Sequence, residues 1–432
     1  MSKKVLVVGG GVIGLCTAYY AARRGHAVTV LDRESAEHQG CSFGNAGMVV
    51  PSHFVPLAAP GMVALGLKWM WNPESPFWIK PRLDFDLMDW GWKFWRAANP
   101  DHVRRSAPIL RDLHLASRAC FQELASLPGN DFGLVEKGLL MLCKTQHGFE
   151  EECKAAEQAR ALDIPAEVLD PGQAAALDPG IRMEIAGAIY FPKDCHLTPH
   201  RFMSGLQHQL QKMGVHLSWS TEVIGWHVKE ASFTSSPSAS GHRQKTIKAV
   251  RTSRGDFDAD EFVLCGGSWS PSIARELQLD LPMQAGKGYS LTLPNPRQLP
   301  SICAILTEAR LAVTPMGKDL RFAGTMEIAG LNETINPRRI QGILKSIPQY
   351  YPDFSARDFA SIQPWCGLRP CSPDGLPYAG RVRSFSNFSV ATGHAMMGLS
   401  LGPITGKLMS EILSDESPSM PMQILDPDRY AH

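Results

Sequence analysis

The hydrophobic pattern at the start of the chain predicts a βαβ unit. Val5–Val8 is a short apolar run typical of a buried parallel strand, and Ala27–Leu31 is a second one that ends at the charged Asp32. The uncharged stretch 5–22 between basic pairs is long enough to suggest a membrane span. Glycines at positions 9, 10, 11 and 14 would weaken a spanning helix, so we predict strand, turn, helix and strand instead.

Two kinds of pattern alternate along the rest of the chain. Helical periodicity predicts helices over 107–127 and 149–162, and a helix followed by a strand recurs over 206–228. Segments 285–293 and 309–330 instead alternate apolar and polar residues with turn residues between, as antiparallel strands do. We therefore predict an α/β nucleotide-binding domain interleaved with a mainly antiparallel α+β domain.

Three segments have no clear period. Residues 41–61 form a long run of small residues, predicted to be a loop that approaches a flat ligand, or else a plain surface connection. Residues 229–245 are polar and serine-rich and predict an exposed loop. Residues 67–95 hold six of the ten tryptophans. Such aromatic density usually fills a core or an interface, and the alternatives are a lid over a substrate or a patch for a membrane or a quinone-bearing partner.

Composition narrows the class of protein. The 432 residues suffice for two or three domain cores, and 44% apolar with 20% charged residues is typical of a globular enzyme. A net charge of +1 argues against nucleic acid as the main partner. The ten cysteines have irregular spacing without CxxC, which favours a reducing compartment and predicts no metal site.

The first turn carries a phosphate-binding pattern. Gly9, Gly11 and Gly14 fit G-x-G-x-x-G between strand and helix, where they permit a tight turn, close approach of a pyrophosphate, and helix–strand packing. Asp32, 18 residues after Gly14, is placed to accept hydrogen bonds from a ribose. This unit predicts a dinucleotide site but does not separate FAD from NAD.

A second glycine-rich turn near the end of the chain favours a flavin. A Gly-Leu-Arg-Pro turn over 367–370 precedes a predicted strand over 387–393 and a glycine-rich helix start over 393–402. A helix N-terminus directed at the flavin N1–C2=O edge would stabilise the negative charge of the reduced ring, a need that NAD enzymes lack.

With these motifs in order, the sequence resembles the D-amino acid oxidase-like superfamily of FAD enzymes, and especially bacterial D-amino acid dehydrogenases of the small-subunit type. The resemblance covers nearly the whole chain and rests on "VLVVGGGVIG", "SFGNAGMVVPSHFVPLAAPG", "DCHLTP", "KGYSLTL", "AGTMEIAG", "GLRPCSPDGLPYAG" and "TGHAMMGLSLG". It implies noncovalent FAD, oxidation of a Cα–N bond to an imine that water hydrolyses, and substrate over the re face of the flavin.

The resemblance also implies two interleaved domains. We predict a Rossmann-like FAD-binding domain from 1–50, 196–228, 258–280 and 364–432, and a substrate-binding domain from 51–195, 229–257 and 281–363. The expected cofactor-binding residues are Gly9, Gly11, Val12, Ile13, Gly14, Asp32, Arg33, Ser42, Asn45, Ala46, Gly47, Val223, Gly266, Gly267, Trp269, Gly367, Gly393, His394, Gly398, Leu399 and Ser400.

Four residues are candidates for the chemistry. Arg369 resembles the carboxylate clamp of the family, because a guanidinium pairs with a carboxylate through two parallel bonds; the alternative is an arginine that bonds loop carbonyls. Tyr289 is expected to bound the substrate cavity, or to be a strand aromatic. His53 and His394 are expected to favour a neutral amine or assist proton transfer, or only to pack. His196 matches no known role.

The predicted activity is FAD-dependent oxidative deamination of D-amino acids. Oxidation of D-proline or hydroxyproline, oxidation of glycine or sarcosine, an NAD(P)-dependent dehydrogenase, and a non-enzymatic FAD-binding protein remain alternatives. The electron acceptor is a quinone of the respiratory chain or oxygen, and no nucleic-acid partner is expected. We expect a cytoplasmic protein, with peripheral contact to the inner face of the cell membrane as an open alternative.

Overall fold

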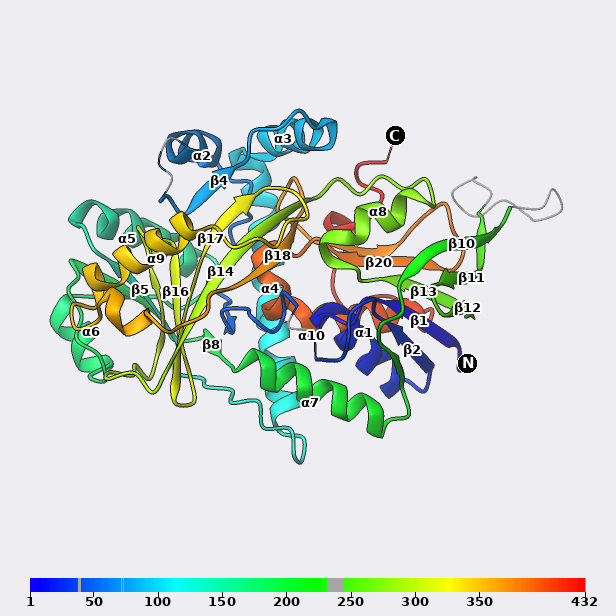
Figure 1. Ribbon diagram of the computed structural model, residues 1–432, viewed down its shortest axis with the longest axis horizontal. Helices are drawn as coiled ribbons and strands as arrows, with labels where there is room; N and C mark the ends of the chain where they lie inside the picture. Colours follow the sequence, from blue (N-terminus) through cyan, green and yellow to red (C-terminus); the bar gives the residue numbers. More distant parts are fainter. Residues whose placement is uncertain (38–39, 71, 73, 231–243, 432) are drawn as a thin grey trace.

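A six-stranded sheet organises the part of the chain at the right of Figure 1. The computed structural model describes residues 1–37, 40–70, 72, 74–230 and 244–431. The strand order is β19-β20-β13-β1-β2-β9, parallel except for the edge strand β19. The strands are β1 (Lys4–Val8), β2 (Ala27–Leu31), β9 (His216–Ser218), β13 (Glu261–Leu264), β19 (Tyr378–Arg381) and β20 (Phe388–Thr392).

Side-chain alternation in β1 sends residues to a different core on each face of this sheet. Val5 and Val7 pack with helices α1 (Val12–Arg23), α4 (Pro100–Ala125), α7 (Pro199–Lys212) and α10 (Gly398–Leu413). Leu6 and Val8 join the opposite core, which includes residues of a small sheet of three antiparallel strands. Its strands are β10 (Val223–Lys229), β11 (Thr246–Thr252) and β12 (Gly255–Asp258), near helix α8 (Ser270–Arg275). A sheet covered on both faces explains the almost continuous apolar strands.

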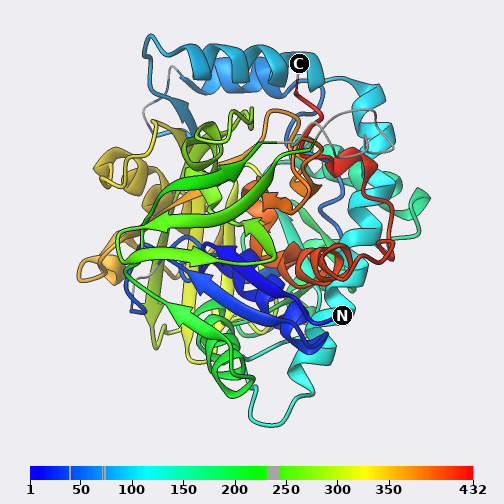
Figure 2. The ribbon, with the colours of Figure 1, turned by 90° about the vertical axis from the view of Figure 1, so that its right-hand side faces the viewer.

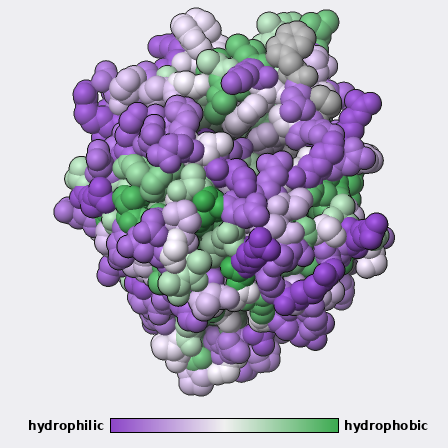
Figure 3. Space-filling view, turned by 90° about the vertical axis from the view of Figure 1, so that its left-hand side faces the viewer, coloured by the Kyte–Doolittle hydropathy of each residue, from purple (hydrophilic) through white to green (hydrophobic). Residues whose placement is uncertain are grey.

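A nine-stranded, mainly antiparallel sheet fills the left of Figure 1. Its order is β18-β14-β17-β16-β15-β5-β7-β6, and β4 pairs in addition with β17. These strands are β4 (Phe77–Ile79), β5 (Leu139–Cys143), β6 (Glu167–Leu169), β7 (Gly187–Phe191), β14 (Gln284–Pro294), β15 (Cys303–Leu306), β16 (Leu311–Met316), β17 (Asp319–Ile328) and β18 (Trp365–Cys371). Helices α5 (Gln146–Ala161), α6 (Pro171–Leu177) and α9 (Pro337–Tyr350) accompany it, and hydrophilic residues cover most of its outer face, with small apolar patches between them (Figure 3).

The predicted mixed fold is confirmed, but one local prediction is wrong. The Gly-Leu-Arg-Pro segment is not a turn: it lies within β18, where Gly367 pairs with Gly288 and Arg369 pairs with Gly286 of β14. Proline is tolerated there because β18 is an edge strand, so the missing N–H of Pro370 need not serve a second neighbour. Most of the predicted loop 229–245 lies outside the described residues.

The domain boundaries remain a proposal, with one adjustment. Strand β11 pairs with β10, and its residues Ile247 and Val250 pack in the same core as Leu6 and Val8. We therefore propose that residues 244–257 belong with the parallel sheet rather than with the substrate-binding domain.

The tryptophan-rich stretch contains both buried and exposed tryptophans. In both ribbon views its helices α2 (Met62–Met70) and α3 (Phe85–Ala97) lie together at one end of the molecule (Figure 1 and Figure 2). Trp90 is buried and donates its indole N–H to the carbonyl oxygen of Cys371 at 2.8 Å, whereas Trp92 and Trp95 are more than half exposed. Trp71 lies outside the described residues. Within the described chain, no helix is both long and apolar enough to span a bilayer.

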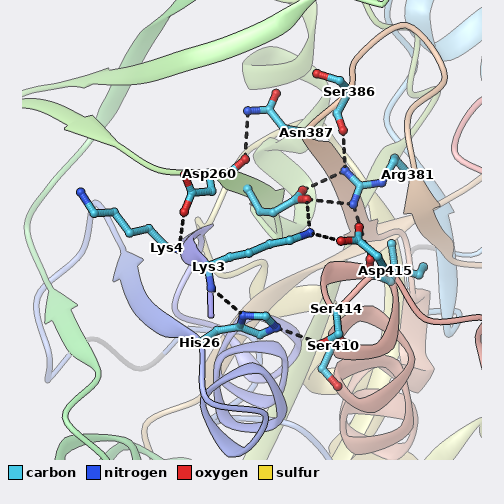
Figure 4. A network of polar contacts seen from close by, with 12 residues as sticks. Lys3, Lys4, His26, Asp260, Arg381, Ser386, Asn387, Ser410, Ser414 and Asp415 are labelled. Carbon is cyan, nitrogen blue, oxygen red and sulfur yellow. Dashed lines mark hydrogen bonds and ion pairs between the residues drawn. The ribbon is translucent and has the colours of Figure 1, made fainter. Parts of the chain in front are cut away.

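A buried carboxylate ties the ends of the parallel sheet to α10. Glu261 of β13 is 5% exposed and pairs with Lys3 at 3.0 Å and with Arg381 at 2.8 Å. Lys3 also pairs with Asp415, just beyond α10, and its backbone N–H donates to His26 (Figure 4). This network joins β1, β13, β19 and α10, and the opposite ends of β1, β13 and α10 border the glycine cavity described below.

Helices α1 and α10 cross closely because α10 carries two glycines at the crossing. A Cβ on Gly406 would lie 2.4 Å from the backbone carbon of Cys16, whereas a Cβ on Gly402 would meet a side-chain methyl of Val12 at 2.9 Å. Gly406→Ala is therefore expected to lower the free energy of unfolding by about 1–3 kcal/mol, the usual effect of overpacking. Urea unfolding checks this, with Gly402→Ala as the milder control because a side chain can rotate away. Equal stability of Gly406→Ala and the parent would contradict the packing argument.

Candidate active site

Two neighbouring cavities lie between the sheets. The first, here called the glycine cavity, is bordered by Gly9–Gly11, Gly266–Gly267 and Gly398. The second, here called the aromatic cavity, has Trp69, Phe77, Trp90, Phe94, Tyr289 and Trp365 in its wall. Cys41 and Asn45 border both cavities, so a ligand in one can reach the other.

The three glycines of the first turn have different surroundings, which match different roles. Gly9 has φ +114°, and a Cβ there would lie 2.4 Å from the carbonyl oxygen of Cys265. A Cβ on Gly14 would lie 1.8 Å from the carbonyl oxygen of Gly9. A Cβ on Gly11 would meet only Ser42 Oγ, at 3.6 Å. Gly9 and Gly14 are thus required for packing, whereas Gly11 keeps space open on the cavity side.

The N-termini of α1 and α10 both face the glycine cavity. The cavity wall includes Val12 and Ile13 of α1 and Gly398 and Leu399 of α10. Neither N-cap residue supplies a capping side chain, and neither first turn contains an acidic residue. Ser42 Oγ accepts the Val12 N–H at 3.0 Å. Two positive helix ends directed into one space are suited to anionic or carbonyl groups.

Asp32 and its neighbours border the glycine cavity. The Asp32 carboxylate accepts the backbone N–H of Gly10 at 2.6 Å and that of Glu34 at 2.9 Å. The Arg33 guanidinium lies 4.0 Å from the centre of the Trp269 ring, a cation–π distance. Trp219, which the sequence did not single out, packs against Gly10 and also lines the cavity.

Most of the expected cofactor residues line the glycine cavity, but six do not. Those that line it are Gly9, Gly11, Val12, Ile13, Asp32, Arg33, Ser42, Asn45, Val223, Gly266, Gly267, Trp269, His394, Gly398 and Leu399. Ala46 and Gly367 line the aromatic cavity instead. Gly14, Gly47, Gly393 and Ser400 border neither: Gly47 packs on Leu197, Gly393 packs on Tyr378, and Ser400 Oγ accepts the Val50 N–H. Of these four, Gly14 and Ser400 lie in the first turns of α1 and α10, and Gly47 and Gly393 lie in the connections that lead to β3 and α10.

Arg369 places an unpaired cation in the wall of the aromatic cavity. Its Nη1 donates to the carbonyl oxygen of Thr325 at 2.5 Å, and it forms no ion pair with any described residue. A Cβ on Gly288 would lie 2.2 Å from its Nη2, so the guanidinium rests directly over that glycine. Burial lowers the pKa of Arg369 from its usual value. A half-buried guanidinium without a carboxylate partner among the described residues is suited to an anionic ligand.

The partner of Arg369 has an unusual backbone. Thr325 lies within β17 with φ +68°, a region that β-branched residues rarely adopt. The pairing of β14 with β17 is irregular beside it, between Lys287 and Tyr289. Strained residues of this kind cluster at ligand-binding positions, and here the irregularity accompanies a carbonyl that holds the guanidinium.

The Tyr289 hydroxyl already has partners within the protein. It donates to Glu327 Oε2 at 2.8 Å and accepts the backbone N–H of Asn336 at 3.3 Å. Glu327 also pairs with the buried Lys287 at 3.2 Å. Although Tyr289 lines the aromatic cavity, we therefore propose that its ring forms the wall while its hydroxyl serves the structure, rather than a substrate carboxylate.

The candidate histidines lie in different cavities. His53 lines the aromatic cavity, and burial together with Arg310 lowers its pKa to about 4. His394 lines the glycine cavity; its Nε2 contacts Thr405 Oγ1 at 3.0 Å, and burial lowers its pKa to about 3. His394 Nδ1 is buried without a hydrogen-bond partner among the described residues. His394 thus borders the glycine cavity and not the aromatic cavity. His196 is a buried residue of the short strand β8 (Cys195–His196), which pairs with β3 (Met48–Val49).

Sequence reasoning missed several residues of the aromatic cavity. Thr325 and Arg310 line it, but a threonine within an alternating strand and an arginine in a hairpin carry no recognisable signal. Ser52 contacts His53 through its hydroxyl, and Asp194 accepts a hydrogen bond from Ser52. Asp194 is the first residue of the "DCHLTP" segment, and this motif was the one sequence signal that could have drawn attention to it.

Comparisons with known proteins agree with this arrangement. Residues 4–412 match the model of the DAO family, described as FAD dependent oxidoreductase. D-amino acid dehydrogenase of Granulibacter bethesdensis is 31% identical over 99% of this chain and 100% of its own. The enzyme of that name from Agrobacterium fabrum is 32% identical over 99% of each chain.

Solved structures share the fold at lower identity. Glycine oxidase from Geobacillus kaustophilus superposes with a TM-score of 0.77 at 22% identity, covering 100% of both chains. L-proline dehydrogenase from P. horikoshii has a TM-score of 0.71 at 16% identity, covering 99% of this chain and 98% of that one. Two glycine-lined turns closing on one cavity, a guanidinium in the next, and a family match along nearly the whole length lead to one assignment: the chain belongs to the DAO family of FAD-dependent oxidoreductases.

Proposed function

We propose that this protein oxidises D-amino acids at the Cα–N bond, giving an imine that water hydrolyses to a 2-oxo acid and ammonia. The observation that carries this proposal is Arg369, a half-buried guanidinium with no carboxylate partner among the described residues, in the wall of a largely apolar cavity beside the glycine cavity. In this proposal its guanidinium binds the substrate carboxylate. The curated relatives named D-amino acid dehydrogenase support the substrate class.

The residues of the glycine cavity fit FAD. Gly11 leaves space beside the N-terminus of α1, where a pyrophosphate would lie, and Asp32, which follows β2 in the cavity wall, would accept hydrogen bonds from a ribose. The uncapped N-terminus of α10 and the unpartnered Nδ1 of His394 would face the ring end. When bound, FAD supplies the acceptor for the Cα hydrogen as hydride. The protein's own part is to hold the carboxylate, orient Cα and exclude water.

The aromatic cavity favours apolar side chains. Its wall contains two arginines, Arg310 and Arg369, but no described Asp, Glu or Lys. A substrate ammonium on a side chain would meet like charge there without a partner, which costs several kcal/mol. We expect kcat/KM for D-phenylalanine or D-methionine to exceed that for D-lysine or D-arginine by at least ~100-fold, or about 3 kcal/mol. Faster oxidation of D-arginine would contradict this reading of the cavity.

Anaerobic bleaching tests the proposed function. The purified protein should be yellow, should release FAD on denaturation, and should lose its flavin absorption on addition of a D-amino acid without oxygen. L-amino acids, glycine, sarcosine, D-proline and hydroxyproline are the matched comparisons. Repeating the assay with oxygen and with a soluble quinone identifies the acceptor. Retention of full colour with every amino acid would reject the proposal.

A further inference from the structure

A buried carboxylate is linked through a serine to His53, the one histidine among the described residues that line the aromatic cavity. Asp194 lies in the turn between β7 and β8, has no solvent exposure, and holds the turn of residues 50–53 through two hydrogen bonds. Its Oδ1 accepts the Ser52 N–H at 3.0 Å, and its Oδ2 accepts the Ser52 hydroxyl at 2.5 Å. Ser52 Oγ in turn lies 3.1 Å from His53 Nδ1. The three side chains form a continuous chain from the interior to the cavity wall.

The hydrogen bonds fix which nitrogen of His53 carries a proton. Ser52 has a single hydroxyl proton, which it donates to Asp194. Its oxygen must therefore accept from His53, so Nδ1 carries the proton and Nε2 keeps a lone pair. His53 lines the aromatic cavity, and its Nε2 has no hydrogen-bond partner among the described residues. The histidine is prepared to accept a proton at its free nitrogen.

We infer that His53, Ser52 and Asp194 form a relay that removes one proton from the ammonium group of the bound amino acid. The inference rests on the proposed function and adds to it the residues that prepare the substrate. As the ammonium N–H bond breaks, its proton joins Nε2, the Nδ1 proton passes to Ser52 Oγ, and the Ser52 proton passes to Asp194. The electron pair stays on the substrate nitrogen, which becomes the neutral amine from which a Cα hydride can leave. After product release the proton returns by the same route to water in the cavity.

The charges around the relay place the proton on Asp194 rather than on His53. Burial raises the pKa of Asp194 to about 7 against the two Ser52 hydrogen bonds, with Arg118 of α4 as the opposing charge. His53 faces Arg310 from the hairpin between β15 and β16 and His114 from α4, and its pKa is lowered to about 4. His53 therefore transfers the proton to Ser52 and does not remain positively charged. Below neutral pH Asp194 is already protonated, so the relay cannot accept another proton.

The pH dependence of kcat/KM in the holoenzyme tests the relay. In the parent enzyme kcat/KM for D-phenylalanine should rise with pH as Asp194 loses its proton. Asp194→Asn keeps the shape but cannot accept the proton, so the rise should move toward the pKa of the substrate ammonium itself. We expect a loss of about 100-fold at pH 7, typical of general-base catalysis, and recovery to within about threefold at high pH. Ser52→Ala should behave alike, and Ser52→Thr should restore the parent profile because the hydroxyl is what carries the proton.

A structural role for Asp194 predicts a different result. Asp178 offers a matched control, since it is equally buried and accepts backbone N–H groups of Ser301 and Ile302 away from both cavities. Asp178→Asn should keep the parent pH profile. An equal loss at every pH in Asp194→Asn, or an unchanged profile in both Asp194→Asn and Ser52→Ala, would overturn the relay. Failure of the parent enzyme to bleach with any amino acid would instead reject the proposed function itself.

Discussion

Arg369→Leu is expected to leave the protein yellow while lowering kcat/KM for D-amino acids by at least ~30-fold, or about 2 kcal/mol, the order expected for loss of a charged hydrogen bond. Leucine cannot pair with a carboxylate, but the glycine cavity does not use Arg369, so FAD should be retained. Steady-state kinetics with D-phenylalanine and the flavin spectrum measure the two effects separately. Arg369→Lys should recover only part of the loss, because an ammonium lacks the planar fork.

The second arginine of the cavity wall provides the control for this variant. Arg310 lines the same cavity but is exposed and lies in a hairpin turn. Arg310→Gln should change kcat/KM by less than about threefold, in the range of surface electrostatic effects. Near-normal kinetics in Arg369→Leu together with a large loss in Arg310→Gln would assign the carboxylate to Arg310 instead.

Gly11→Leu is expected to yield a folded, colourless protein. Gly11 has φ −73°, which any residue adopts, and its Cβ would meet only Ser42 Oγ at 3.6 Å. The chain should therefore fold, but a leucine side chain would occupy the space beside the N-terminus of α1. We expect FAD affinity to fall at least ~100-fold, about 3 kcal/mol, because the pyrophosphate loses its approach to the helix end.

The smaller substitution at the same position separates blocking from misfolding. Gly11→Ala adds only a Cβ and should retain most of the flavin. After the flavin is removed, both variants should show the circular dichroism and unfolding midpoint of the parent apoprotein. Flavin content per chain after gel filtration gives the measurement. Full retention of FAD by Gly11→Leu would show that the pyrophosphate lies elsewhere.

Local patterns predicted much of the nucleotide-binding region. The second strand of the βαβ unit begins and ends where its apolar run predicts, and the first strand begins one residue earlier, at Lys4. The apolar runs follow from one physical cause: the part of a strand that is buried on both faces must be apolar, and Lys4 is the exposed first residue of β1. The glycine pattern was equally informative, because contacts as close as the one between Gly9 and Gly14 tolerate no side chain.

The substrate side was less predictable, because its contacts join distant strands. Turn chemistry predicted a turn at 367–370, but pairing with β14 makes this segment a strand, and local propensity could not anticipate that partner. The engagement of Tyr289 by Glu327, 38 residues away, and the irregular β17 backbone at Thr325 likewise arise only after the sheet assembles. Asp194 is 141 residues from His53 and meets it only through Ser52.

The segment from Cys41 to His53 belongs to the walls of both cavities, and this has a thermodynamic consequence. Asn45 holds its turn by accepting the Gly47 N–H, and Arg321 of β17 fastens the segment by donating to the carbonyl oxygens of Phe43 and Asn45. A ligand in either cavity should order the same backbone segment. The first ligand to bind then bears the loss of conformational entropy, and the second ligand does not bear it again. Prosthetic group and amino acid should then bind with positive cooperativity. By reciprocity, a non-reactive carboxylate analogue should lower the flavin dissociation constant by the same factor by which the flavin lowers that of the analogue.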